Sequence, residues 1–197
     1  MARGRQLRRR LWSSPGGWVL GAAAALLCAP LLAACSGGGA DGGDRLPRAE
    51  TARLTAIADA YLQRRADAVT AVARDTGPLP PPAHLTPAFA RRTAHDLGKL
   101  AESGRQLQRV DGGYGRAQVD TVARAATRRG DTVTLEVMED TDLLPPADQA
   151  DAPTEEYALS HTLTFERTDS GGWLLAGDRP ETGAGMPPAT QVRAASG

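Results

Sequence analysis

Several residue types are scarce in this chain, and their scarcity limits the chemistry that it can contain. The 197 residues include no asparagine, one lysine, three histidines and two cysteines, Cys28 and Cys35. Neither cysteine lies beyond residue 35, so the rest of the chain has no thiol for a disulfide or a thiolate nucleophile. Three scattered histidines without cysteines do not match a zinc site. We therefore expect neither a metal nor a cofactor.

The first 34 residues have the pattern of an export signal. Five arginines and no acid lie in the first ten residues, and an uncharged run extends from Gly17 to Ala34. A basic start, a short apolar run and small residues before a cleavage point are typical of secretory signals. The run ends in Leu-Ala-Ala-Cys at residues 32–35. This string resembles the lipobox of bacterial lipoproteins, and the resemblance implies that Cys35 is lipid-modified and begins the mature chain.

Two alternatives concern how this segment acts. An uncleaved membrane anchor is disfavoured because the run is near the lower limit of spanning length and contains Pro30. Arg8-Arg9-Arg10 also resembles a twin-arginine export signal, although a leucine precedes the arginines where a polar residue is expected. Both export routes predict a protein held by its lipid on the outer face of the cytoplasmic membrane.

Cleavage before Cys35 changes the charge of the protein. The full chain has 23 basic and 23 acidic residues, and loss of the five leader arginines leaves 18 basic residues and a net charge of about −5. Nucleic-acid binding is disfavoured, because phosphates require a basic surface. Seven acids and no base lie between Glu139 and Glu156. Calcium prefers such ligands, but the spacing fits no calcium loop, and we expect a solvated acidic loop.

The mature chain divides into a tether, one domain and a tail. Residues 35–48 comprise the lipidated cysteine and a Gly-rich stretch that is expected to be flexible. Apolar residues at helical spacing predict helices over residues 49–74 and about 87–107, with Thr86-Pro87 as the start of the second helix. Residues 181–197 are rich in Gly, Pro and Ala and are expected to be a disordered tail.

Beyond Gly112 the hydrophobic period changes from helical to two residues. Alternation predicts four strands, at about 118–125, 133–138, 157–166 and 173–176, with a hairpin turn between the last two. One face is apolar and the other is polar, as in an antiparallel sheet that is covered on one side. The sequence therefore predicts an α+β domain over residues 49–180, with two helices packed on a four-stranded meander.

Short strings within this domain resemble known families. They are Ala60–Ala66, Tyr157–Phe165, Gly172-Trp173 and Asp178–Pro180. They resemble a region of secreted actinobacterial proteins that precedes a predicted amidase domain, and the order of elements resembles the cone-shaped nuclear transport factor two-like (cystatin-like) fold. The amidase domain and its catalytic cysteine have no counterpart here, so no amidase activity is implied. The resemblance does imply an accessory module for cell-wall hydrolases as one possible role.

His161 is the main candidate for chemistry. It lies between Leu159 and Leu163 on the apolar face of its predicted strand, and matched apolar faces place Val137 opposite it. Glu139 is then a diagonal neighbour within reach of a long side chain. A His–carboxylate pair in a pocket could act as a general acid and base. A hydrogen-bonded core histidine is the favoured alternative.

The predicted site and function follow from these features. The residues expected to line an inner pocket are Tyr61, Tyr157, His161 and Trp173. We expect a non-catalytic domain that binds a small ligand, a protein or a glycan of the cell envelope. The alternative is a small isomerase or cyclase that uses His161 and Glu139.

Overall fold

The computed structural model describes residues 44–71 and 79–181. The predicted signal at 1–34, the lipobox with Cys35, most of the tether and the predicted tail from residue 182 lie outside the described residues. The elements in chain order are β1 (Asp44–Arg45), α1 (Arg48–Thr70), α2 (Pro87–Asp111), β2 (Arg116–Arg129), β3 (Thr132–Leu144), the 3-10 helix η1 (Ala147–Gln149), β4 (Glu155–Arg167) and β5 (Trp173–Pro180). No helix in the described part is both long and apolar enough to cross a membrane.

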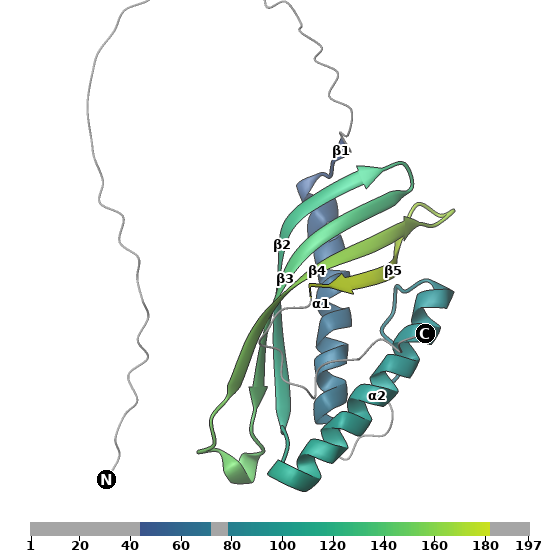
Figure 1. Cartoon of the computed structure of the whole chain (residues 1–197). Helices are drawn as coiled ribbons and strands as arrows, with labels where there is room; N and C mark the ends of the chain where they lie inside the picture. Colours follow the sequence, from purple (N-terminus) through teal and green to yellow (C-terminus); the bar gives the residue numbers. More distant parts are fainter. Residues whose placement is uncertain (1–43, 72–78, 182–197) are drawn as a thin grey trace, which may run out of the picture. The chain divides into compact units, whose positions relative to one another are not determined.

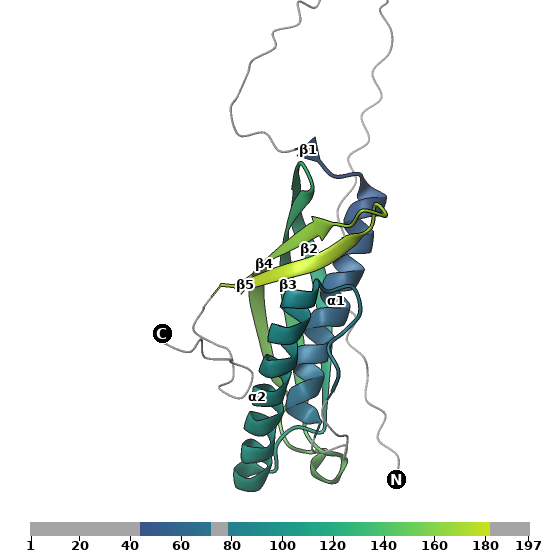
Figure 2. The same cartoon turned by 90° about the vertical axis from the view of Figure 1, so that its right-hand side faces the viewer.

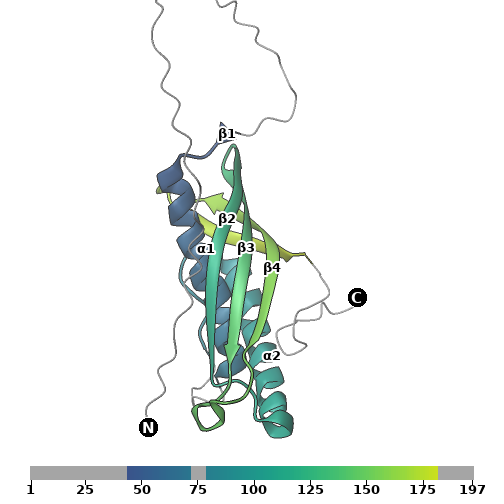
Figure 3. The ribbon, with the colours of Figure 1, turned by 90° about the vertical axis from the view of Figure 1, so that its left-hand side faces the viewer.

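The strands form one antiparallel sheet in the order β1-β2-β3-β4-β5. Both helices cover the same face of this sheet (Figures 1 and 2), and Figure 3 shows the opposite face of β2, β3 and β4 without a covering element. The predicted α+β class is confirmed, but the sheet has five strands instead of four. Asp44 and Arg45, predicted to belong to the tether, pair with Arg128 and Thr127. The free backbone groups at the edge of β2 explain this pairing.

The core lies between the helices and the covered face of the sheet. Helix α1 buries Leu54, Ala58, Tyr61 and Leu62, whose spacing places them on one helical face. The strands contribute alternating buried residues that include Leu135, Leu163, Phe165 and Leu175, each with no exposed surface. This apolar packing surrounds the polar side chains that are described below.

Local signals explain the ends of α2. The Thr86 side chain accepts a hydrogen bond from the Phe89 backbone N–H, and Pro87 is the first helical residue, as the sequence predicts. The helix ends at Asp111, and the next residue, Gly112, has a φ of 74°, the left-handed conformation that favours glycine. Helix α2 is therefore one turn longer than the predicted end at residue 107.

Two register shifts reverse which residues of a strand face the core. One shift lies in β2, where Arg124 is the extra residue between Ala123 and Ala125, and the other lies in β5, where Ala176 is the extra residue opposite Thr164 and Phe165 of β4. A single extra residue in a strand exchanges the two faces beyond it. The alternation predicted over residues 118–125 would place Ala125 on the same face as Val119. This placement is wrong, because Ala125 is exposed and Ala126 is partly buried.

Two glycines of α2 provide a matched test of how the helices pack. A Cβ added to Gly104 would overlap the backbone carbonyl of Val69 in α1, whereas a Cβ at Gly98 meets no atom within 4 Å. We expect Gly104→Ala to lower the free energy of unfolding by about 1–3 kcal/mol, as overpacking does. The matched control Gly98→Ala should raise it by about 0.5–1 kcal/mol. Urea unfolding measures both, and equal effects would contradict the close approach of the helices at Gly104.

Candidate functional site

The predicted His–Glu pair exists, and strand pairing positions it. Val137 lies opposite His161, and Glu139 lies opposite Leu159, as predicted. The two side chains reach each other diagonally across β3 and β4, with 2.7 Å between His161 Nε2 and Glu139 Oε2. Both side chains point to the face that the helices cover, since His161 is 2% exposed and Glu139 is 5% exposed.

A second carboxylate, which the sequence reasoning missed, contacts the other nitrogen of the ring. Asp178 Oδ1 of β5 lies 2.8 Å from His161 Nδ1, and the Asp178 side chain is 3% exposed. Continuing the alternation of Trp173 and Leu175 would place Asp178 on the outer face. The register shift opposite Thr164 and Phe165 reverses this order and turns Asp178 inward. Asp178 is therefore a second inward-facing acid that simple alternation along the strand does not reveal.

Helix α1 contributes two further side chains to the cluster. The Tyr61 hydroxyl donates to Asp178 Oδ2 at 3.1 Å, and Arg65 donates to the Tyr61 hydroxyl at 3.2 Å. The Arg65 guanidinium also lies 4.0 Å from Asp178. Residues four apart share a helix face, so the spacing of Tyr61 and Arg65 could have identified Arg65 as a neighbour of the site.

Glu139 has its own hydrogen-bond donors within the sheet. The Thr141 hydroxyl donates to Glu139 Oε1 at 2.7 Å, and the Tyr157 hydroxyl donates to the same oxygen at 3.2 Å. Tyr157 lies directly opposite Thr141 in the strand register, which brings both donors to one side of the carboxylate. We refer below to the seven residues joined in this way as the buried cluster: Tyr61, Arg65, Glu139, Thr141, Tyr157, His161 and Asp178.

The charges of the buried cluster balance when His161 is protonated. A neutral imidazole donates only one N–H, whereas here both ring nitrogens face carboxylate oxygens, so the imidazolium fits best. Burial alone would lower the pKa of His161, but the hydrogen bonds with Asp178 and Glu139 outweigh it and raise the pKa from 6.5 to about 9. Burial raises the pKa of Tyr61 and Tyr157 above the usual range, so both phenols remain protonated donors. Two cations, His161 and Arg65, then face two anions.

The remaining predicted lining residue lies elsewhere. Trp173 donates from its indole nitrogen to Glu50 Oε1 at 2.6 Å, and the guanidiniums of Arg128 and Arg167 lie over its ring. The structure therefore brings together Tyr61, Tyr157 and His161, whereas Trp173 joins the start of α1 to the sheet.

Two surface hollows, each of about 540 Å³, are lined by described residues. One lies beside the start of α1, and the other is lined by residues of β2, β3 and β4. Most residues of this second hollow point outward, but Thr141 and Tyr157 of the buried cluster also line it. Neither hollow is lined by His161, Glu139 or Asp178. The side chains of His161 and Glu139 are 1% and 6% exposed, and they line neither of these two hollows.

Metal binding by the buried cluster would require replacing its existing hydrogen bonds, since both imidazole nitrogens are occupied. Among residues 44–71 and 79–181, no group of three or more His, Cys, Asp or Glu side chains is arranged to hold a metal ion. The other two histidines, His84 and His95, are exposed.

The predicted acidic loop is only partly a loop. Asp140 and Asp142 lie in β3 and point outward, where Asp140 faces Asp120 and Asp142 faces Glu156 across the strands. Glu139 points inward, so its assignment to the solvated loop is wrong, and the reason is the strand alternation that separates it from Asp140.

Comparisons with known proteins give limited information. No protein-family model matches the chain, and no curated protein matches it in sequence. Among solved structures, a match is found to a protein described as "Ntf2 like protein involved in plasmid conjugation", with 12% sequence identity and a TM-score of 0.32. The match covers 70% of this chain and 50% of that protein.

Proposed function

We propose that this protein is a lipid-anchored, extracytoplasmic binding module with a nuclear transport factor two-like fold and no catalytic activity. The location rests on the basic start, the apolar run and the lipobox ending at Cys35. The fold assignment rests on two helices packed against one face of an antiparallel meander, together with the resemblance in sequence.

The proposal that the protein is not an enzyme rests on the contacts and the burial of His161. A general acid or base must reach a proton of its substrate, directly or through one water. Both nitrogens of His161 are instead held by carboxylates at 2.7 and 2.8 Å, and the ring is almost fully buried. A group that is bound on both sides and enclosed in this way stabilises the fold, and it has no free position for a substrate.

A small acid–base enzyme is the second candidate, because the His161–Glu139 pair has the contact that such chemistry needs. This function requires that the core opens and that one carboxylate releases the ring. The two candidates therefore differ in whether reagents in solution reach His161.

Chemical modification distinguishes the candidates. We expect diethylpyrocarbonate, which modifies neutral imidazoles, to react with the exposed His84 and His95 at least about a hundred-fold faster than with His161, since opening a buried site by about 3 kcal/mol gives that ratio. Mass spectrometry of peptides from the folded protein measures the three rates. Modification of His161 at the rate of His95 would instead show an accessible site and favour the enzyme.

The anchor has a separate test. Substitution Cys35→Ser should abolish incorporation of a labelled fatty acid and release the protein from the membrane fraction, because serine lacks the thiol that is lipidated. Substitution Cys28→Ser, within the predicted leader, is the matched control and should leave labelling unchanged. Labelling that persists in the Cys35→Ser protein would refute the anchor.

A further inference from the structure

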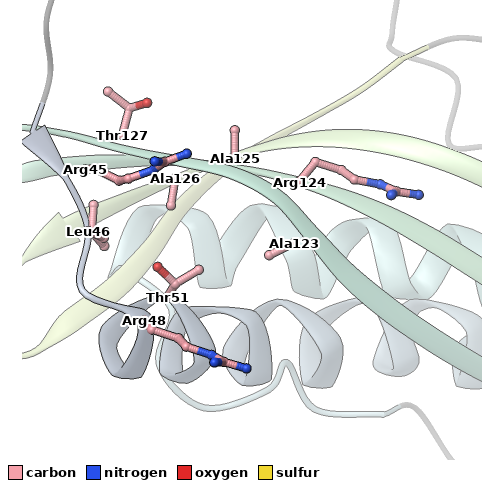
Figure 4. A pocket seen from close by; sticks show the side chains of 9 residues that line it. All are labelled: Arg45, Leu46, Arg48, Thr51, Ala123, Arg124, Ala125, Ala126 and Thr127. Carbon is pink, nitrogen blue, oxygen red and sulfur yellow. The ribbon is translucent and has the colours of Figure 1, made fainter. Parts of the chain in front are cut away.

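We propose that the hollow beside the start of α1 binds the phosphate group of an anionic phospholipid in the membrane to which the protein is tethered. This inference rests on the proposed lipid anchor for its choice of phosphate source. The hollow has a volume of about 540 Å³ and is bounded by β1, the first turn of α1 and the second half of β2 (Figure 4).

Small side chains and a register shift create the hollow. Ala123 and Ala126 of β2 face Thr51 of α1 across it (Figure 4), and none of the three is large enough to fill the space. The register shift between Ala123 and Ala125 turns the intervening Arg124 outward at the edge of the hollow. The packing between sheet and helix is therefore interrupted in a region whose lining includes Arg45, Arg48 and Arg124.

Three arginines from three different elements line the hollow. They are Arg45 of β1, Arg48 of α1 and Arg124 of β2, and all three are exposed. Guanidinium groups recognise phosphate through paired hydrogen bonds. In the described part of the chain, the structure gives these three side chains no ion pair or hydrogen bond, so their donors are available to a ligand.

The start of α1 adds to the positive potential of the hollow. The N-terminus of a helix carries a partial positive charge and unpaired backbone N–H groups, both of which favour phosphate. Glu50 is the acid in this first turn, and its carboxylate accepts a hydrogen bond from the Trp173 indole. In the described part of the chain it forms no ion pair with the three arginines. The hollow thus combines exposed guanidiniums with the dipole of a 23-residue helix.

The residues that line the hollow begin close to Cys35 in the sequence, which favours a membrane lipid as the source of the phosphate group. Cys35 precedes Asp44 by nine residues, and a segment of that length cannot extend beyond about 32 Å. A lipid on Cys35 would therefore hold β1 and the hollow near the headgroups.

The distribution of charge favours the same orientation. The acids of the β3–β4 connection and of η1, such as Asp148 and Asp151, lie at the opposite end of the sheet from β1 (Figure 1). Surface charges act over about 8 Å at physiological salt, so the arginines beside the membrane would outweigh the distant acids despite the net negative charge. This arrangement would turn the acidic end away from the anionic lipid.

Vesicle binding without the lipid anchor tests the proposal. Every described helix and strand lies between residues 44 and 181, so a chain of residues 36–197 retains the whole fold and lacks Cys35. We expect it to co-sediment with vesicles of equimolar phosphatidylglycerol and phosphatidylcholine, and not with pure phosphatidylcholine. The triple variant Arg45→Gln, Arg48→Gln, Arg124→Gln should bind about a hundred-fold more weakly, at roughly five-fold per arginine near the surface.

A matched variant separates a specific site from a general effect of charge. The substitutions Arg91→Gln, Arg116→Gln and Arg179→Gln remove three exposed arginines elsewhere and should leave binding within about two-fold. An equal loss in both triple variants, or equal binding to pure phosphatidylcholine, would overturn the proposal. A further outcome is that inorganic phosphate changes the NMR chemical shifts of Arg45, Arg48 and Arg124 while the chain does not bind vesicles. The hollow would then bind free phosphate, and the proposed lipid ligand would be wrong. Because this chain carries no lipid, these outcomes do not depend on the Cys35 labelling test.

Discussion

Substitution His161→Gln is expected to lower the free energy of unfolding by about 3–5 kcal/mol, which is typical for removing one member of a buried ion pair. The imidazolium lies between Glu139 and Asp178, with ring-to-carboxylate distances of 2.7 and 2.8 Å. A neutral glutamine leaves these two buried anions facing Arg65 alone. Urea unfolding at pH 7 measures the loss.

The exposed His95 on α2 provides the matched control, and His95→Gln should change stability by less than about 0.5 kcal/mol. The double variant His161→Gln with Glu139→Gln removes one charge of each sign. We expect it to lose less stability than the sum of the two single variants, with a coupling of about 1–3 kcal/mol. Additive losses, or a His161→Gln loss below about 1 kcal/mol, would contradict the role given to the buried cluster.

Stability is also expected to decrease at alkaline pH. The pKa of His161 is raised in the folded state, from 6.5 to about 9, because Asp178 and Glu139 stabilise the imidazolium more than burial opposes it. A group with a raised folded pKa contributes stability that is fully present below the unfolded pKa and disappears as the pH rises through the folded pKa. At about 1.4 kcal/mol per pKa unit, roughly 3 kcal/mol is lost between about pH 6.5 and 9. This loss reflects the same interactions that the His161→Gln variant removes, so the two effects are not additive.

Unfolding at several pH values, with the His161→Gln protein as the reference, tests this expectation. The difference in stability between parent and variant should be largest near pH 6 and smallest near pH 10, since only the parent has the ionisable ring. Burial keeps Tyr61 and Tyr157 protonated over this interval, so they do not interfere. A difference that stays constant with pH would show that His161 is not protonated in the folded protein.

The buried cluster connects elements that are distant in the chain. Tyr61 and Arg65 come from α1, Glu139 from β3, His161 from β4 and Asp178 from β5. A well-packed apolar replacement of such a cluster is often as stable, so its presence is not itself an argument for high stability. Its hydrogen bonds form only when helix and strands have one relative position, and we therefore regard it as a device that fixes the register of α1 on the sheet.

The sequence predicted one contact of the cluster because that contact depends on local rules. Alternation and the matching of apolar faces gave the pairing of Val137 with His161, and the position of Glu139 followed. Asp178 could not be predicted in this way, because its direction depends on a register shift that the alternation pattern does not reveal. Arg65 could have been identified from its i,i+4 spacing to Tyr61, although an exposed arginine is the usual expectation for a helix.

The sequence alone determined the α+β class, the meander, the start of α2 at Thr86-Pro87 and the prediction of a lipid anchor at Cys35. These features follow from periodicity, caps and composition, which act over a few residues. Only the tertiary structure decided that β1 joins the sheet, that Asp178 completes the contacts of His161 and that three arginines line one hollow. Those features depend on strand registers and on helix position, which arise only when separate segments of the chain pack together, as β1 does on β2.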